Sequence, residues 1–450
     1  MPLGVPPISP YGPGTLRVAA LLALTVGGRR VLPVTLAVVI ALSPLCAVRA
    51  QGIPLAAPQD VGLSPSALER IAPALQAYVD SGRLSGIVAI IVRHGKVGYM
   101  SAVGYMDMQA QTAMRTDAVF RIASMTKPII AVATVRLAEQ GKLRLDDPVS
   151  KYIPAFADAK VYAGGDALSP VLARPDRLIT IEHPLTHTAG LTYGFFGETP
   201  VDSIYRRAGL SNAARTTEQF VDSVAHLPLV SSPGSAWNYS VATDVLGRVI
   251  EVASGRSLDH FLDDEIFAPL AMRETAFHVR PEMEGRIPVL YSRGPDGHLR
   301  AAAQLLSPGY RPDGRFLSGG GGLLSTPADY LRFAQMLLNG GELDGRRVVR
   351  RESVADIMRN HLSPALTPIV SPMVGHAGYG QGFGGVVLVD SARAGSAASP
   401  GTYRWWGING TFFWIDPQAD LIGMVWTHNP GRTDPLEQDF QRLVYAAITR

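Results

Sequence analysis

Apolar and polar positions along the chain follow two periods, and the changes between them predict the layout of the fold. The segment GIVAIIVRHGKVGYMSAVG (86–104) holds two β-rich apolar runs around HGK and predicts a hairpin. From about residue 179 to 272, apolar residues recur mostly at helical spacing, between capping residues and glycines. Strand-like runs return near the C-terminal end as GVVLVD, YRWWG, TFFWIDP and LIGMVWTH.

Strands at both ends and helices in the middle predict an α+β protein. We expect an antiparallel sheet flanked by helices, formed by 58–122 together with 290–450, and a mostly helical subdomain inserted at 123–289. A catalytic cleft is expected where the two subdomains meet. The segment 63–82 predicts one helix ahead of the hairpin, and 391–401 predicts a flexible surface loop.

The first 50 residues differ from the rest, because they contain four arginines and no acidic residue. The apolar run VLPVTLAVVIALSPLCAV is too short and too interrupted by proline for a membrane span. It ends in VRAQ, with small residues at the positions that signal peptidase requires. We therefore expect a secretion signal over 1–50, cleaved after Ala50, and an exported protein, periplasmic or secreted, with no stable membrane span.

Removal of this leader changes the charge and the cysteine count. The whole chain has a net charge of +3, but without the four arginines 37 basic and 38 acidic residues remain, so the net charge is −1. A chain of this charge has no basic patch that would indicate nucleic acid as a partner. The single cysteine, Cys46, is lost with the leader, which leaves neither a disulfide nor a thiol nucleophile.

The stretch FRIASMTKPII (120–130) places Ser124 and Lys127 three residues apart. Lys127 is one of only five lysines in a chain with 36 arginines, and lysine can release its proton whereas arginine cannot. Pro128 is tolerated only in the first turn of a helix, so Ser124 should lie at the helix start, where free amides can bind an oxyanion. A buried lysine there could activate the serine as a nucleophile. The simpler alternative is a capping serine and a surface lysine.

Two further stretches carry candidate chemistry. PGSAWNYSVATDVLG places Tyr239 after a Pro-Gly turn and before a helix, where a phenol facing a lysine can serve as a base. RWWGINGTFFWIDP places Gly407 in a strand, and a strand glycine often marks close approach of a ligand backbone. The alternatives are a core aromatic residue at a helix start and an aromatic core strand.

Together these stretches resemble the serine β-lactamase and penicillin-binding-protein superfamily, in particular its class C-like branch with the family VIII carboxylesterases. The resemblance covers roughly residues 58–445 and includes PLTHTAGL and GGGGLLSTPADYLRFAQMLL. It implies that Ser124 is the acylated nucleophile and that Lys127 and Tyr239 are its base system. It also implies an oxyanion hole made by the backbone amides of Ser124 and Ile408.

In this resemblance Trp405, Trp406 and Gly407 occupy the third motif. Lactamases of the superfamily carry Tyr-x-Asn and Lys-Ser/Thr-Gly, whereas this chain has YSV, with Val241 at the amide position, and WWG. No lysine occurs after Lys160, so a cationic anchor for a lactam carboxylate is missing, and the tryptophans favour an apolar substrate group. Arg404 could bind a carboxylate, but strand alternation should point it away from the face of Trp405.

We therefore expect a secreted serine hydrolase, most simply a carboxylesterase for short- to medium-chain esters. The alternatives are a β-lactamase, D,D-peptidase or D-aminopeptidase-like amide hydrolase, a transesterase, and a non-catalytic wall-binding or sensor module. The expected partner is a small ester or amide, without a cofactor or metal. His183 and His187 are four residues apart, but Pro184 separates them and no glutamate follows His183, which argues against a zinc site. The oligomeric state is left open.

Overall fold

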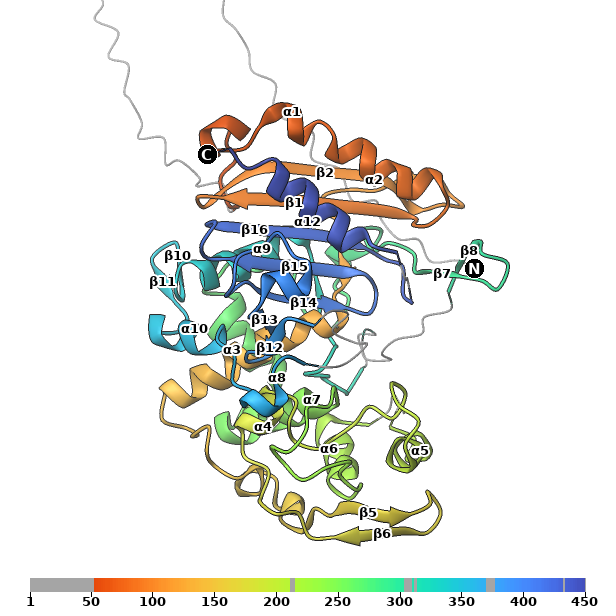
Figure 1. The fold of residues 1–450 in the computed structure, drawn as a ribbon, viewed down its shortest axis with the longest axis vertical. Coiled ribbons are helices and arrows are strands. Elements are labelled where there is room, and N and C mark those ends of the chain that lie inside the picture. The colour runs from red at the N-terminus through yellow and green to blue at the C-terminus, as the bar shows by residue number, and fades with distance from the viewer. Residues whose placement is uncertain are drawn as a thin grey trace, which may run out of the picture. The chain divides into compact units, whose positions relative to one another are not determined.

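The sheet joins the two ends of the chain. The hairpin of β1 (Gly86–Arg93) and β2 (Lys96–Asp107) pairs through β1 with β16 (Leu421–Thr427), so that Ile87 lies opposite Thr427. Eight strands follow in the order β12-β13-β14-β15-β16-β1-β2-β3, every neighbouring pair antiparallel (Figure 1). The others are β3 (Thr112–Ala113), β12 (Tyr379–Gln381), β13 (Val386–Leu388), β14 (Tyr403–Gly407) and β15 (Thr411–Asp416).

The computed structural model describes residues 52–210, 215–302, 310, 314–369, 377–431 and 434–449. The leader expected at 1–50, with its cleavage position, lies outside these residues. Within the described part of the chain, no helix is both long and apolar enough to cross a membrane.

Both faces of β1 are buried, and its alternate residues join two different cores. Ile87, Ala89 and Ile91 join a smaller core against α1 (Pro65–Leu68), α2 (Ile71–Asp80) and α12 (Leu436–Ala446). Val88, Ile90 and Val92 point the other way, into the main core. A strand between two layers of helices must be apolar on both faces, and this explains its unbroken apolar run.

The single helix expected over 63–82 is instead two helices, because α1 ends at Leu68 and α2 begins at Ile71, with a turn at residues 69–70 between them. Pro73 accounts for the break. In one continuous helix its ring would clash with the carbonyl of Glu69, whereas in the first turn of a new helix the missing amide costs nothing.

The main core holds the helices that position the candidate site. α3 (Thr126–Glu139) packs against α7 (Ala242–Ser254), and α9 (Pro327–Leu338) packs against β15 and β16. The remaining helices are α4 (Glu182–Leu185), α5 (Pro200–Arg207), α6 (Thr217–Ala225), α8 (Leu258–Leu262), α10 (Arg351–Ile357) and α11 (Ser391–Ala394). The loop expected at 391–401 thus begins with the short helix α11, which Asp390 caps.

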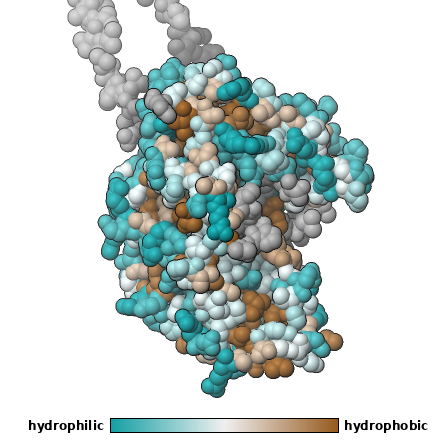
Figure 2. Space-filling model, in the orientation of Figure 1, coloured by the Kyte–Doolittle hydropathy of each residue, from teal (hydrophilic) through white to brown (hydrophobic). Residues whose placement is uncertain are grey.

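Four small two-stranded sheets complete the described strands. They are β4 (Phe120–Arg121) with β9 (Leu324–Ser325), β5 (Val161–Gly165) with β6 (Pro170–Ala173), β7 (Tyr291–Arg293) with β8 (Leu299–Ala301), and β10 (Glu342–Leu343) with β11 (Arg346–Arg347). Apolar surface gathers over the β5–β6 hairpin (Figures 1 and 2), where the side chain of Leu168 is 84% exposed. The α+β class with an antiparallel sheet is confirmed, while the subdomain boundaries and the cleft stay predictions.

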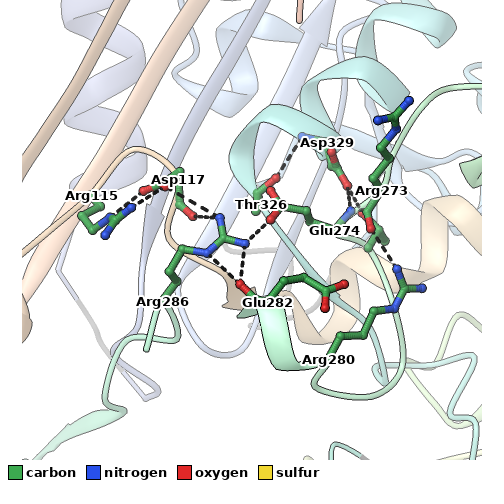
Figure 3. A network of polar contacts seen from close by, with 10 residues as sticks. Arg115, Asp117, Arg273, Glu274, Arg280, Glu282, Arg286, Thr326 and Asp329 are labelled. Atoms are coloured by element: carbon green, nitrogen blue, oxygen red, sulfur yellow. Dashed lines mark hydrogen bonds and ion pairs between the residues drawn. The ribbon is translucent and has the colours of Figure 1, made fainter. Parts of the chain in front are cut away.

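A polar network fixes the chain around residues 273–286 to the start of α9 (Figure 3). Arg286 pairs with Glu274 and lies 3.7 Å from the Asp117 carboxylate. Asp329, in the first turn of α9, accepts hydrogen bonds from the Glu274 amide at 2.7 Å and the Thr275 hydroxyl at 3.0 Å. Burial raises the pKa of the Asp329 carboxyl to about 6, so this group titrates within an accessible pH range.

Candidate active site

Ser124 lies in a single 3-10 turn, Ala123–Met125, that leads directly into α3. Ala123 has a φ of 45°, a left-handed conformation that a residue with a side chain rarely adopts. The Ile122 amide donates to the Leu323 carbonyl at 3.1 Å and fixes the chain ahead of the turn. Ser124 is partly exposed between buried neighbours, so the strained turn presents its hydroxyl at the start of a helix.

Lys127 is fully buried, one turn beyond Ser124. Its Nζ donates to the Gly320 carbonyl at 2.5 Å and to the Tyr193 hydroxyl at 2.9 Å, and it lies 3.4 Å from Ser124 Oγ. These contacts match the three donors of an ammonium group. The surface-lysine alternative is therefore wrong for this position.

Tyr239 completes the predicted set. Its hydroxyl lies 2.6 Å from Ser124 Oγ, and Lys127 Nζ lies 4.8 Å from the centre of its ring. The neighbouring Asn238 fixes the segment, because its amide donates to the His187 carbonyl at 2.8 Å and its side chain to the Leu191 carbonyl at 2.6 Å. The structure thus brings Ser124, Lys127 and Tyr239 together. Ser124 and Tyr239 are 115 residues apart in the sequence.

Gly407 lies where β14 meets the turn that carries Ser124. A Cβ at this position would lie 2.2 Å from the Ile122 carbonyl oxygen and 2.5 Å from Thr411 Oγ1, so only glycine fits. Asn409 adds a second connection by donating to the Arg121 carbonyl at 3.0 Å. The backbone of Gly407 and Ile408 is therefore held against the segment of Ser124, as a shared pair of amides would require.

Trp405 and Trp406 do not offer the exposed aromatic surface that was expected of them. Trp405 is only 1% exposed, and its ring lies behind Tyr239, with 5.7 Å between ring centres, and stacks on His187. Trp406 is partly buried, with its ring centre 4.3 Å from that of Trp405, and Val241 is buried at the start of α7. The correction follows from strand alternation, which turns Trp405 toward the main core.

Sequence reasoning missed Tyr193 and the aromatic pair Phe195 and Phe196. The Tyr193 ring centre lies 5.2 Å from that of Tyr239, and burial raises its pKa well above the ordinary value, so the phenol stays neutral. Phe195 and Phe196 are 59% and 40% exposed, with ring centres 5.2 Å from Tyr193 and 5.6 Å from Tyr239. The only sequence signal was their position within five residues of the end of PLTHTAGL.

The two histidines four residues apart have separate surroundings. His183 Nδ1 accepts a hydrogen bond from the Thr180 amide at 2.9 Å. Burial lowers the pKa of His187 well below its ordinary value, so this ring is an uncharged neighbour of Tyr239 at 4.9 Å. Among the residues that the structure describes, no group of three or more His, Cys, Asp or Glu side chains could hold a metal ion.

Comparisons with known proteins show which family the chain belongs to. The family model described as Beta-lactamase matches residues 71–447. Protein Rv1367c of Mycobacterium tuberculosis is 35% identical over 77% of this chain and 86% of its own length, and Esterase EstB of Burkholderia gladioli is 34% identical over 85% and 98%. The solved structure of EstCE1, described as a hydrolase with promiscuous acyltransferase activity, matches with a TM-score of 0.73 and 29% identity, over 84% of this chain and 99% of its own. The chain therefore belongs to the beta-lactamase family and is a serine hydrolase of its esterase-like branch.

Proposed function

We propose that the protein is a carboxylesterase that forms an acyl-enzyme on Ser124. One observation carries this proposal: Ser124 Oγ lies 2.6 Å from the Tyr239 hydroxyl and 3.4 Å from Lys127 Nζ at the start of a helix. In the reactive state the Lys127–Tyr239 pair lacks one proton and accepts the proton of Ser124.

The reaction then proceeds in two steps. Ser124 Oγ attacks the ester carbonyl, and the amides of Ser124 and Ile408 stabilise the oxyanion that forms. The alcohol leaves with a proton from the Lys127–Tyr239 pair. Water, activated by the same pair, attacks the acyl-enzyme and releases the acid. An alcohol in place of water would give acyl transfer, a second candidate function that the likeness to EstCE1, a hydrolase with promiscuous acyltransferase activity, favours.

The side chains around the nucleophile support an apolar ester as the substrate. Phe195 and Phe196 place exposed aromatic surface beside the rings of Tyr193 and Tyr239. Ile408 is also exposed, next to Gly407. Contact with such surface favours an acyl or alcohol group of several carbons.

A β-lactam finds less support. Val241 is buried and provides no amide to bind the side chain of a lactam substrate. The guanidinium of Arg404 lies over the ring of Tyr379, at 4.1 Å from its centre. Packing in the core thus accounts for the position of this cation, and a lactam carboxylate is not needed to explain it. No lysine follows Lys160 in the sequence.

The test compares kcat/KM for p-nitrophenyl acetate, butyrate and octanoate with that for nitrocefin on one preparation. We expect the butyrate ester to exceed nitrocefin, and we expect Ser124→Ala to lose both activities. A higher value for nitrocefin would overturn the esterase assignment. Unchanged properties in Ser124→Ala would favour the non-catalytic wall-binding or sensor module.

Export is a separate proposal, supported by the acid-free leader and its apolar run. Protein recovered from the periplasm or the medium should begin at Gln51. An intact chain found only in the cytoplasm would contradict export and leave the esterase proposal untouched.

A further inference from the structure

Asp244 is a buried carboxylate that reaches Lys127 through one glycine. It lies in the first turn of α7, and its Oδ1 accepts hydrogen bonds from the Ser318 hydroxyl at 2.6 Å and the Gly320 amide at 2.9 Å. The carbonyl of the same Gly320 accepts the hydrogen bond from Lys127 Nζ at 2.5 Å. Gly320 therefore donates a hydrogen bond to Asp244 through its amide and accepts one from Lys127 through its carbonyl.

The packing around Gly320 leaves no space for a side chain at this position. A Cβ at this position would lie 2.4 Å from Asp244 Oδ2 and 2.9 Å from the Tyr193 hydroxyl oxygen. Both are closer than real Cβ contacts, so a side chain would have to displace the carboxylate or the phenol. Gly320 thus fills the space between Asp244 and the groups that contact Ser124.

The charges around Lys127 also connect it to Asp244. The titratable side chains that the described structure places around Lys127 are Tyr193, Tyr239, His187 and Asp244. Asp244 alone among these four is a carboxylic acid. Burial raises the pKa of its carboxyl, while the attraction of Lys127 and the hydrogen bonds from Ser318 and Gly320 lower it. A buried cation is stabilised by such a partner, because isolated charge in the interior is costly.

We propose that Asp244 is a positioning residue, whose carboxylate holds Gly320 against Lys127 and sets how readily the Lys127–Tyr239 pair releases a proton. This inference rests on the proposed acyl-enzyme function. Asp244 does not touch Ser124 or the ester; it acts through the Gly320 backbone and through its charge.

The test is Asp244→Asn, which keeps the shape and one acceptor oxygen and removes the negative charge. Without that charge, both the ammonium of Lys127 and the phenol of Tyr239 lose their protons more readily. The whole profile of kcat/KM against pH should therefore move to lower pH, by roughly one unit. The direction is the same whichever of the two groups takes the first proton.

Asp329→Asn is the matched control, because it also removes a buried carboxylate but one that contacts Glu274 and Thr275 instead. Its pH profile should coincide with that of the wild type. Should Asp244→Asn fail to fold, Gly320→Ala is the second variant, because its Cβ would displace the Asp244 carboxylate or the Tyr193 hydroxyl. Either displacement removes a group that stabilises the Lys127 cation, so the profile should move in the same direction. A folded variant of either kind with an unmoved profile would overturn the proposal.

A second measurement separates this inference from the proposed function. Wild-type protein and folded Asp244→Asn are each treated with a fluorophosphonate, and the adduct is mapped by mass spectrometry. Labelling of Ser124 in both proteins, together with an unmoved pH profile in Asp244→Asn, would refute only the role of Asp244 and leave the acyl-enzyme standing. Absence of labelling in the wild type would refute the acyl-enzyme, whatever the variant does.

Discussion

Replacing Tyr193 with phenylalanine removes one oxygen atom from the candidate active site and leaves the ring in place. In the wild type that hydroxyl accepts a hydrogen bond from Lys127 Nζ at 2.9 Å. The other close acceptor of Nζ is the Gly320 carbonyl at 2.5 Å, whereas Ser124 Oγ lies at 3.4 Å. The variant therefore leaves a fully buried ammonium group with one short hydrogen bond instead of two.

The size of the effect follows from this geometry. A hydrogen bond to a charged group contributes about 1.5–3 kcal/mol, and no water replaces the lost acceptor when the cation is buried. Since about 1.36 kcal/mol corresponds to a tenfold change in rate, a loss expressed in the transition state lowers kcat by about 10- to 150-fold. KM should change little, because the ring that faces Phe195 and Phe196 remains.

The assay is steady-state hydrolysis of p-nitrophenyl butyrate, with thermal melting to confirm that the variant folds. Tyr162→Phe is the matched control, because the Tyr162 hydroxyl donates to the exposed Gly165 carbonyl of the β5–β6 hairpin. Its kcat should equal that of the wild type. A kcat of folded Tyr193→Phe within twofold of the wild type would refute the view that this hydroxyl supports the catalytic lysine.

Three further predictions test the substrate surface, the third motif and the polar network. Phe196→Ala should reduce the preference for butyrate over acetate esters, because contact of each methylene is worth about 0.8 kcal/mol, or about fourfold in kcat/KM. Leu168→Ala, which also changes an exposed apolar residue, should leave this preference unchanged. The same ester preference in Phe196→Ala and the wild type would contradict the assignment. Gly407→Ala forces a Cβ to within 2.2 Å of the Ile122 carbonyl oxygen. We therefore expect kcat to fall strongly and the free energy of unfolding to fall by about 1–3 kcal/mol. Full activity of this variant would argue against the oxyanion role of this turn. Asp329 has a folded-state pKa of about 6, above its ordinary 3.8, so it binds its proton more tightly when folded. The wild type should therefore lose roughly 2 kcal/mol of stability as the pH rises from about 4 to about 6. Urea unfolding should show that this loss is absent in Asp329→Asn, and an identical pH dependence would contradict the prediction.

The sheet could be predicted because local patterns encode it. The apolar runs of β1 and of β14 to β16 are long and bounded by turns, so their existence follows from the sequence. The set of Ser124, Lys127 and Tyr239 could also be predicted, since each lies in a short motif with its own spacing. The roles implied for these residues stay predictions until the acyl-enzyme is observed.

The rest of the site depends on contacts that no local pattern encodes. Lys127 meets Tyr193 66 residues later and Gly320 193 residues later, and only the packed fold brings these segments together. Asp244 looks like an ordinary acid in the first turn of a helix. Trp405 was misjudged for a related reason: its residue type suggested contact with substrate, but the register of β14 in the sheet decides which face it takes.

The central claim is that Ser124 is the residue that becomes acylated, and one measurement tests it most directly. Protein without the leader is treated with a fluorophosphonate, digested, and examined by mass spectrometry beside Ser124→Ala. The account predicts one phosphonylated site, on the peptide containing Ser124, and no adduct in the variant. A folded wild-type sample that remains unlabelled, or that carries the adduct on another residue, would contradict it.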